Sequence, residues 1–270
     1  MRSFFRSSAR PIAVFTLAAV LVGCGSSLPT KPKSKSTGLR TMTNVPGATL
    51  PGQPQVAAGA DQGKGAQLLG RVRQHLDTIN GFSAEILCKT QGNYKQGQKQ
   101  AELRKITIGY KIIWAKPAKL KGEVFNSPDP MMEGAGLVTT DGFNVVARAK
   151  GFLSFVPIKT NAKEPKLNNC RNHSFADFQP SAQIKRLTGP TAVWTVLQDS
   201  VAPNGQPMAF VAVDNVARLD REITREVFGI EVGNLQIRSL TAFGGETKLT
   251  DYTFQKFGWN PKITSETFKM

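Results

Sequence analysis

Cys170 and His173 are the two residues of this sequence whose types and spacing come closest to a catalytic pair. A histidine beside a cysteine can take up the thiol proton and leave a nucleophilic thiolate, but it needs a third group that orients it. No such group accompanies this pair. The sequence also lacks a Gly-x-Ser-x-Gly elbow, a complete phosphate-binding loop and the spacing of a metal site. We therefore expect no enzyme activity, no metal and no cofactor.

Cys88 and Cys170 are the two cysteines that follow Cys24. In an oxidising compartment such an even pair can form a disulfide, which for a loop this long stabilises the fold by about 4 kcal/mol. Two buried thiols are an equal alternative, because spacing alone does not show whether the side chains meet.

The first 23 residues have the parts of a bacterial export signal. Three arginines lie among the first ten residues, and residues 11–22 form an uncharged, mostly apolar run. That run is shorter than the roughly 20 residues of a membrane-spanning helix. It ends in Leu-Val-Gly-Cys at Cys24, which resembles the lipobox of bacterial lipoproteins. The resemblance implies removal of residues 1–23 and attachment of lipid to Cys24.

A lipidated Cys24 implies a stably membrane-anchored protein, since two or three acyl chains hold far more firmly than one. Gly25 follows the cysteine where an aspartate would signal retention in the inner membrane of enteric bacteria. By that analogy we expect a protein of the cell envelope, anchored in the outer membrane and facing the periplasm. An ordinary secretory signal that happens to contain a cysteine is the alternative.

Residues 24–64 differ in composition from the rest of the chain. The whole sequence carries 35 Lys and Arg against 19 Asp and Glu, and no acidic residue precedes Asp61. This stretch is basic and rich in Ser, Thr, Pro and Gly, so it has too little apolar surface to fold. We expect a disordered tether that reaches roughly 35 Å and a folded domain over residues 65–270. Because the basic residues are scattered and the protein is exported, we expect no nucleic-acid partner.

The folded domain begins with a helical pattern and continues with strand patterns. Leu68, Val72, Leu76 and Ile79 form one apolar stripe, which predicts a helix over residues 65–80. Period-two alternation and turn residues then predict about eleven strands. They cover residues 82–90, 104–114, 120–125, 136–140, 144–148, 152–157, 192–198, 208–214, 219–228, 234–242 and 252–257.

One helical stretch divides these strands into two groups. Residues 174–187 have helical character but contain Pro180, which breaks the helix into two short pieces. An antiparallel sheet of about eleven strands tends to curl. We therefore predict an α+β, mostly β fold, in which a strongly curled antiparallel sheet forms an incomplete barrel with an N-terminal helix and a broken lid helix.

This order of elements resembles the LolA/LolB family of lipoprotein carriers over about residues 66–257. The resemblance rests on several short motifs: Asn80-Gly81-Phe82, Trp114-Ala115-Lys116-Pro117, Thr140-Asp141-Gly142, Leu235-Gln236-Ile237 and Asp251-Tyr252-Thr253-Phe254. The family folds as an incomplete barrel whose helices act as a lid. Its soluble carrier has no anchor and its outer-membrane acceptor has one, so Cys24 makes this chain more similar to the acceptor.

The resemblance implies an apolar cavity for acyl chains and a loop that protrudes after the third strand. The residues expected to line the cavity are Ile108, Tyr110, Ile112, Trp114, Val124 and Val138 on strands and Phe175, Phe178 and Ile184 on the lid. Plain core packing is the alternative for each of them. Met131 and Met132 occupy the place of the protruding loop, and the alternative is that both pack into the core.

These observations predict a lipid-anchored envelope protein that binds acyl chains or lipoproteins and acts in lipoprotein transport or sorting to the outer membrane. Its expected partners are acylated cargo, the membrane that holds the anchor and a transport partner protein. Two other functions stay open on the same fold. One is an envelope sensor or regulator that binds a protein partner, and the other is a structural lipoprotein with a filled core.

Overall fold

A computed structural model describes residues 62–94, 102–128, 130, 132–149, 156–164, 167, 171, 173–202, 204–214 and 221–269. The expected signal and lipid site, the tether up to residue 61, Met131 and Cys170 lie outside the described residues. Among the described residues, no helix is both long and apolar enough to cross a membrane.

Helix α2 (Gln62–Thr78) opens the described part of the chain. Its apolar stripe buries Leu68 and Leu69 against the sheet. The helix begins three residues earlier and ends two residues earlier than the apolar stripe predicts, and Ile79 beyond it is buried in the core.

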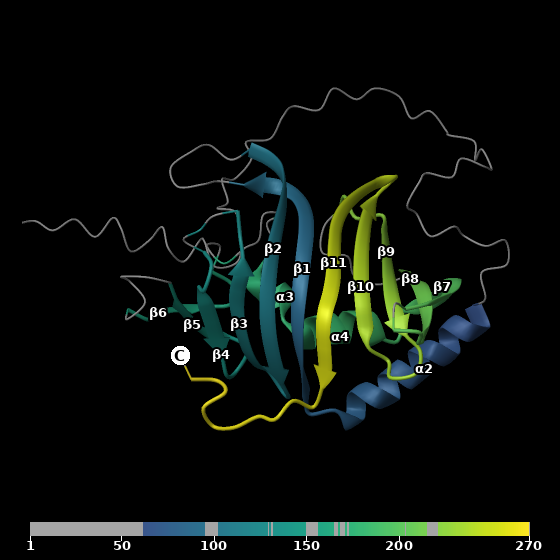
Figure 1. Cartoon of the computed structure of the whole chain (residues 1–270), viewed down its shortest axis with the longest axis horizontal. Coiled ribbons are helices and arrows are strands. Elements are labelled where there is room, and N and C mark those ends of the chain that lie inside the picture. Colours follow the sequence, from purple (N-terminus) through teal and green to yellow (C-terminus); the bar gives the residue numbers. More distant parts are fainter. Residues whose placement is uncertain are drawn as a thin grey trace, which may run out of the picture.

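Eleven strands form one antiparallel sheet (Figure 1). Their bounds are β1 (Gly81–Tyr94), β2 (Glu102–Ala115), β3 (Lys119–Asn126), β4 (Gly136–Thr139), β5 (Asn144–Arg148), β6 (Ile158–Asn161), β7 (Val193–Val201), β8 (Pro207–Asp214), β9 (Arg225–Glu231), β10 (Ile237–Gly244) and β11 (Thr247–Trp259). The prediction of a mostly β fold with an open, eleven-stranded antiparallel sheet is confirmed.

The strand order is β6-β5-β4-β3-β2-β1-β11-β10-β9-β8-β7. Each half is a meander of sequential neighbours, and the pairing of β1 with β11 joins the halves at the centre. These two strands and β2 are the longest, with 13 or 14 residues each. Because β6 and β7 do not pair with each other, the sheet has two edges and stays an incomplete barrel.

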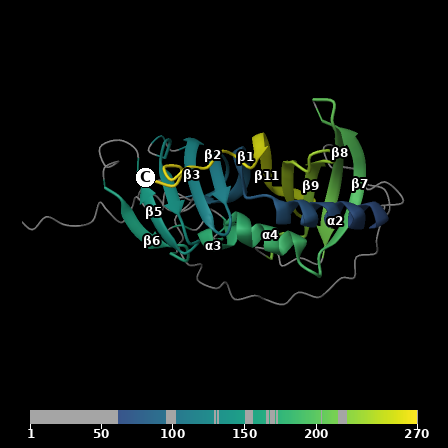
Figure 2. The same cartoon turned by 90° about the horizontal axis from the view of Figure 1, so that it is seen from below.

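Two short helices connect the halves and lie on one face of the sheet. Helix α3 (Phe175–Phe178) is capped by Ser174, whose side chain accepts from the backbone N–H of Asp177, and α4 (Pro180–Thr188) begins with proline. Proline suits the first turn of a helix because its missing N–H would have no partner there. The break predicted at Pro180 is therefore confirmed. Figure 2 shows α3 and α4 along the concave side of the sheet, with α2 beside them.

The core is divided between the two halves of the sheet. One cluster packs Trp114, Leu120, Leu137 and Phe175 beneath the first half, and another packs Leu68, Leu69, Trp194 and Phe228 between α2 and the second half. The region between the clusters, over β1, β11 and β10, lies below α4.

Two predicted strands differ from the described ones. Most of the strand expected over residues 152–157 lies outside the described residues, and the strand described next to it is β6 at Ile158–Asn161. The strand expected over residues 219–228 is β9 at Arg225–Glu231, because Arg221 and Glu222 lie in a turn.

Candidate functional site

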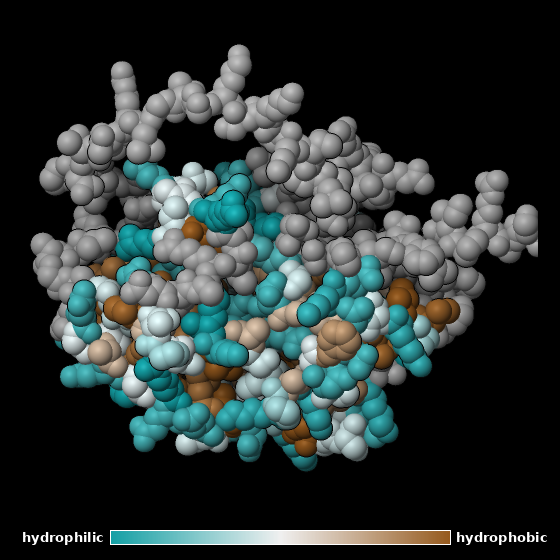
Figure 3. All heavy atoms as spheres, turned by 180° about the vertical axis from the view of Figure 1, so that it is seen from behind, coloured by the Kyte–Doolittle hydropathy of each residue, from teal (hydrophilic) through white to brown (hydrophobic). Residues whose placement is uncertain are grey.

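An apolar groove of about 220 Å³ lies between the concave face of the sheet and the helices. Its walls come from α2, α4 and the strands β1, β2, β7, β9, β10 and β11. Seen from the helix side, apolar side chains show between polar ones on this face (Figure 3). For comparison, an engineered apolar cavity of about 150 Å³ admits benzene. The groove therefore has room for an apolar ligand.

A second cavity of about 140 Å³ continues this groove toward the first half of the sheet. Five residues line both spaces: Ile86, Ile112, Phe178, Pro180 and Tyr252. The two cavities therefore adjoin along β1 and β2 beneath the junction of α3 and α4.

The space exists because α4 does not pack tightly on the sheet. None of its residues is fully buried, although Ile184 and Leu187 face the groove. In a filled core such side chains would lose nearly all contact with solvent, since interiors pack as densely as organic crystals. The lid thus covers the concave face and leaves its own apolar side chains partly uncovered.

β11 supplies much of the apolar floor of the groove. Thr250, Tyr252 and Phe254 alternate toward the groove, whereas Phe257 and Trp259 continue the row after a change of parity. The cause is a β-bulge, because Ile86 pairs with Phe254, Glu85 pairs with Lys256, and Gln255 between these two has no opposite residue. From Thr250 to Trp259 this floor is roughly 30 Å long.

Aromatic rings gather where β11 ends beside α2. The ring centroids of Phe257 and Trp259 lie 4.5 Å apart, those of Phe82 and Phe257 lie 5.4 Å apart, and those of His75 and Trp259 lie 4.9 Å apart. Their edge-to-face and stacked arrangements stabilise this end beyond plain area burial. The Nε2 atom of His75 is buried without a hydrogen-bond partner.

One ion pair crosses the groove from lid to sheet. Arg186 of α4 donates from Nη1 to Oε2 of Glu226 on β9 over 2.6 Å, and the two side chains are 8% and 3% exposed. Gln183 holds the same guanidinium, since its Oε1 accepts from Nη2 over 2.7 Å. Buried charges are costly unless they are paired, so this contact favours the observed position of α4 against β9.

Two further polar contacts hold the ends of α4. The guanidinium of Arg73 on α2 donates to the carbonyls of Thr188 and Gly189 over 2.9 and 2.6 Å, which satisfies groups left open at a helix end. At the other end, the buried side chain of Gln179 donates to the carbonyl of Gly142 in the β4–β5 turn. Polar contacts rather than buried apolar side chains therefore fasten the lid.

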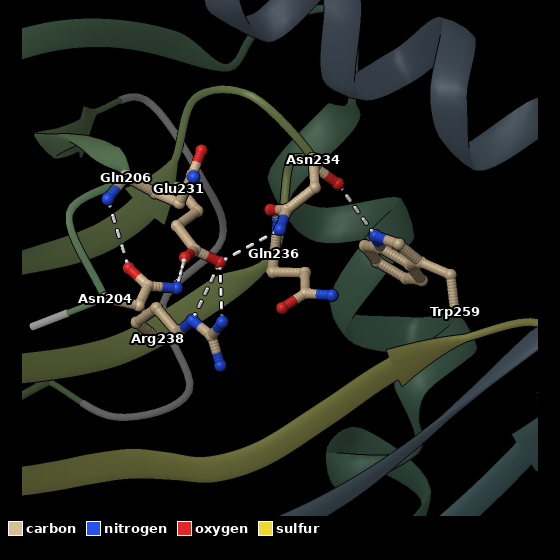
Figure 4. Close-up of polar contacts among 7 residues, drawn as sticks. All are labelled: Asn204, Gln206, Glu231, Asn234, Gln236, Arg238 and Trp259. Carbon is tan, nitrogen blue, oxygen red and sulfur yellow. Dashed lines mark hydrogen bonds and ion pairs between the residues drawn. The ribbon is translucent and has the colours of Figure 1, made fainter. Parts of the chain in front are cut away.

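A buried carboxylate lies beside the aromatic end of the groove (Figure 4). Glu231, which is 0% exposed, accepts hydrogen bonds from Asn204 over 2.6 Å and from Asn234 over 3.1 Å. Arg238 adds bonds of 2.9 and 2.6 Å. Burial raises the pKa of Glu231, but the two asparagines and Arg238 outweigh it and hold the pKa below its usual value.

Most of the expected cavity residues lie around these two spaces. Those that line them are Tyr110, Ile112, Val124, Phe175, Phe178 and Ile184. Ile108 and Trp114 are instead packed into the core. Val138 follows Leu137 on β4, and since Leu137 faces the second cavity, Val138 points to the opposite face. Ligand binding by any of these residues stays a prediction.

The protruding loop differs from the expectation at Met132. This side chain is 5% exposed and packs with Ile106, Ile108 and Val124. The alternative of core packing therefore holds for Met132, because its side chain fills space beside β2 and β3. Met131 lies outside the described residues.

The expected disulfide stays a prediction. Cys88 is buried on β1, opposite Ile108 of β2 and Tyr252 of β11, whereas Cys170 lies outside the described residues.

His173 is buried and stacks on Phe178 with ring centroids 5.3 Å apart. Among the described residues, no three His, Cys, Asp or Glu side chains are grouped so that they could hold a metal ion.

The sequence analysis missed the groove residues on the second half of the sheet, as well as Phe82 and Ile86 on β1 and Val72 and Leu76 on α2. Phe228, Ile230, Leu240, Tyr252, Phe254 and Trp259 all line the groove. The predicted strands contained Phe228, Leu240, Tyr252 and Phe254 but not Ile230 or Trp259, and the strand pattern did not show that β11 returns to pair with β1. That pairing joins residues about 170 positions apart and brings β9–β11 to the same concave face.

An open, curled antiparallel sheet with a helix-covered apolar groove is the class of structure that these elements define. No family model and no curated protein matches the chain. It is similar to an uncharacterized conserved protein from Thermus thermophilus, with a TM-score of 0.44 and 11% identity over 76% of this chain and 92% of that chain.

Two other similar structures are a lipoprotein-sorting domain and a LolA superfamily protein. One is a putative outer membrane lipoprotein-sorting protein domain from Vibrio parahaemolyticus, with a TM-score of 0.38 and 10% identity over 77% of this chain and 97% of that one. The other is a LolA superfamily protein from Nitrosomonas europaea, with a TM-score of 0.32 and 6% identity over 76% and 97%. Structural neighbours thus include LolA-superfamily proteins, but these likenesses are too distant to assign a family or a function.

Proposed function

We propose that this protein is a lipid-anchored protein of the bacterial envelope that encloses acyl chains, or the acylated end of a lipoprotein, in its groove. The observation that supports this function best is the lidded apolar groove itself, which adjoins a second cavity under the same helices. In a filled structural core, Ile184 and Leu187 would be fully buried, but both are partly exposed.

Such a groove would bind an acyl chain tightly, so a carrier also needs a way to release the chain. Each buried methylene contributes about 0.8 kcal/mol, so one long chain supplies ample binding free energy. Release then depends on opening the lid. Because α4 is fastened by Arg73, Arg186 and Gln179 rather than by buried apolar packing, it can move while the sheet keeps its shape.

The sequence adds the expected location of the protein and its role in transport. With lipid on Cys24, the groove would stay within reach of a membrane, and the protein would act in lipoprotein transport or sorting at the outer membrane as an acceptor or carrier. Its role would be binding and transfer, without catalysis. A transport partner that delivers or receives the cargo would complete the pathway.

Native mass spectrometry tests this proposal. The chain after Cys24, exported behind a signal that adds no lipid, is purified without detergent and measured directly. We expect a bound species whose mass corresponds to an acyl-bearing molecule at one per chain. A single apo mass, together with no uptake of a fluorescent fatty acid, would rule out the groove as a lipid site and leave a structural or protein-binding role.

A further inference from the structure

The turn between β9 and β10 contains a backbone conformation that its sequence does not require. Leu235 has a φ of 57°, in the left-handed region that bulky side chains rarely adopt. Gly233 and Asn234 immediately before it are residue types that tolerate this region well. The turn nevertheless places the leucine there, and Leu235 lines the groove.

A buried carboxylate holds this turn in shape. Glu231 ends β9 and receives the side-chain amides of Asn204 and Asn234 together with the guanidinium of Arg238 (Figure 4). Both asparagines are themselves fixed, because their Oδ1 atoms accept the backbone N–H groups of Gln206 and Gln236 over 3.2 and 3.0 Å. Four charge-assisted bonds on one buried acceptor make a rigid support.

Hydrogen bonds with α2, β8 and β11 also hold the same turn. Arg71 of α2 donates to the carbonyl of Val232 over 2.7 Å, and the N–H of Val232 donates to Pro207 of β8 over 2.9 Å. The indole Nε1 of Trp259 on β11 donates to the carbonyl of Asn234 over 2.9 Å (Figure 4). Left-handed strain of this kind persists only where the surroundings over-determine it, and it is concentrated at functional positions.

The turn lies at the end of the groove where the strands β9 and β10 meet. There Leu235 and Trp259 line the groove together with Val72 and Leu76 of α2. The opposite end of the β11 floor is Thr250, roughly 30 Å away along the strand. An acyl chain that lies along this floor from the Thr250 end would reach Leu235 and Trp259 at its far end.

We propose that the clamped β9–β10 turn is a specificity-determining element, in which Leu235 and Trp259 wall off the end of the groove and set the longest acyl chain that it accepts. This inference rests on the proposed function and makes it more specific. Glu231, with the side chains of Asn204, Asn234 and Arg238 that bind it, acts as a positioning group that keeps Leu235 in place when a chain is bound.

A chain-length series tests the proposal. Saturated fatty acids from eight to eighteen carbons serve as probes, and their affinities for the unlipidated chain are measured by calorimetry. For the wild type we expect each added methylene to tighten binding about fourfold, from ~0.8 kcal/mol each, until a plateau. Leu235→Ala removes most of the side chain, so the plateau should move to chains about two to four carbons longer.

Two further variants make the test decisive. Leu235→Gly removes the same side chain and also relieves the left-handed strain, so it guards against a folding defect in the alanine variant. Leu240→Ala, the matched control, shortens a leucine on the side wall in mid-β10 and should shift all affinities alike without moving the plateau. An unchanged plateau in both Leu235 variants would overturn the inference while leaving the proposed function intact. No binding of any probe by the wild type would overturn both.

Discussion

At the scale of single residues, Gly65 decides how closely α2 approaches the sheet. A Cβ atom added there would lie 1.9 Å from the carbonyl oxygen of Trp194 on β7, which is backbone and cannot turn aside. Gly70 on the same helix is exposed and has nothing within 4 Å of its Cβ position. Substitutions at these two positions therefore distinguish the effect of a steric clash with β7 from the effect of replacing a glycine within a helix.

We expect opposite effects from alanine at these two positions. Gly65→Ala should lower the free energy of unfolding by about 1–3 kcal/mol, because it forces α2 away from β7. Gly70→Ala should raise it by up to ~1 kcal/mol, since alanine is the better helix former. Urea denaturation followed by circular dichroism measures both. Equal effects of the two substitutions would contradict the close approach of α2.

Asp141 organises the β4–β5 turn that holds the lid junction. Its carboxylate accepts from the Asn144 side chain over 2.6 Å and from the backbone N–H groups of Phe143 and Asn144 over 2.8 and 2.7 Å. These bonds lower the pKa of Asp141 from 3.8 to about 2. The neighbouring Gly142 has a φ of 77° and accepts the bond from Gln179.

The lowered pKa of Asp141 predicts a pH dependence of stability. Because the folded state favours the ionised carboxylate, the contribution is fully present above the unfolded pKa and is lost as the pH falls from about 4 toward 2. Asp141→Asn should therefore lower the thermal midpoint at pH 6, and the difference from the wild type should shrink at pH 2.5. A constant difference across this range would show that the carboxylate charge does not matter.

At the scale of elements, the lid behaves differently from the helix beside it. Helix α2 buries Leu68 and Leu69 against the second half of the sheet, whereas α4 buries none of its residues completely. A buried ion pair of Arg186 and Glu226, set within an apolar wall, links α4 to the sheet. Such a pair specifies one closed position of the lid more than it adds net stability.

Breaking this pair from one side should loosen the lid. Arg186→Met leaves the Glu226 carboxylate buried without its partner, which costs about 3–5 kcal/mol when one member of a buried pair is removed. The double variant Arg186→Met, Glu226→Leu should recover most of that loss because no charge stays buried. Denaturation of the four members of this cycle gives the coupling free energy. Hydrogen exchange over α4 should rise in the single variant and fall back in the double variant.

At the scale of the whole molecule, the groove is a consequence of how the two half-sheets meet. The pairing of β1 with β11 brings the first and last strands together, and the bulge at Gln255 turns two successive aromatic residues, Phe254 and Phe257, to the concave side. The two core clusters fill the space under the outer strands. The groove is the space that these clusters leave between them.

A blocked groove should abolish any stabilisation by ligand. Leu240→Trp places an indole on the groove wall, whereas Phe143→Trp makes the same kind of change at a side chain that is 51% exposed in a turn. A ligand at 100 times its Kd stabilises the native state by about 2.7 kcal/mol, so palmitate should raise the thermal midpoint of the wild type and of Phe143→Trp. Leu240→Trp should show no rise. An equal rise in all three proteins would place the binding elsewhere.

The features of this structure that could be predicted from the sequence are those that depend on local patterns of residues. Alternating apolar residues, Gly-containing turns and the proline in the lid predicted eleven strands and the broken helix, because periodicity and breakers act over a few residues. The same alternation supplied Tyr110, Ile112 and Val124 as cavity candidates, and these residues do line the two spaces. It could not decide between Leu137 and Val138, since a strand pattern with apolar residues on both faces does not say which face is concave.

The sequence by itself therefore determined the kind of elements, their order, the expected lipid site at Cys24 and the open, curled sheet. Only the tertiary structure decided which strands meet, where the bulge reverses the facing of β11, that Met132 turns inward and that Glu226 lies opposite Arg186. The reason is physical. Propensity and periodicity depend on neighbours along the chain, whereas pairing across more than a hundred residues depends on which arrangement of the whole sheet has the lowest free energy.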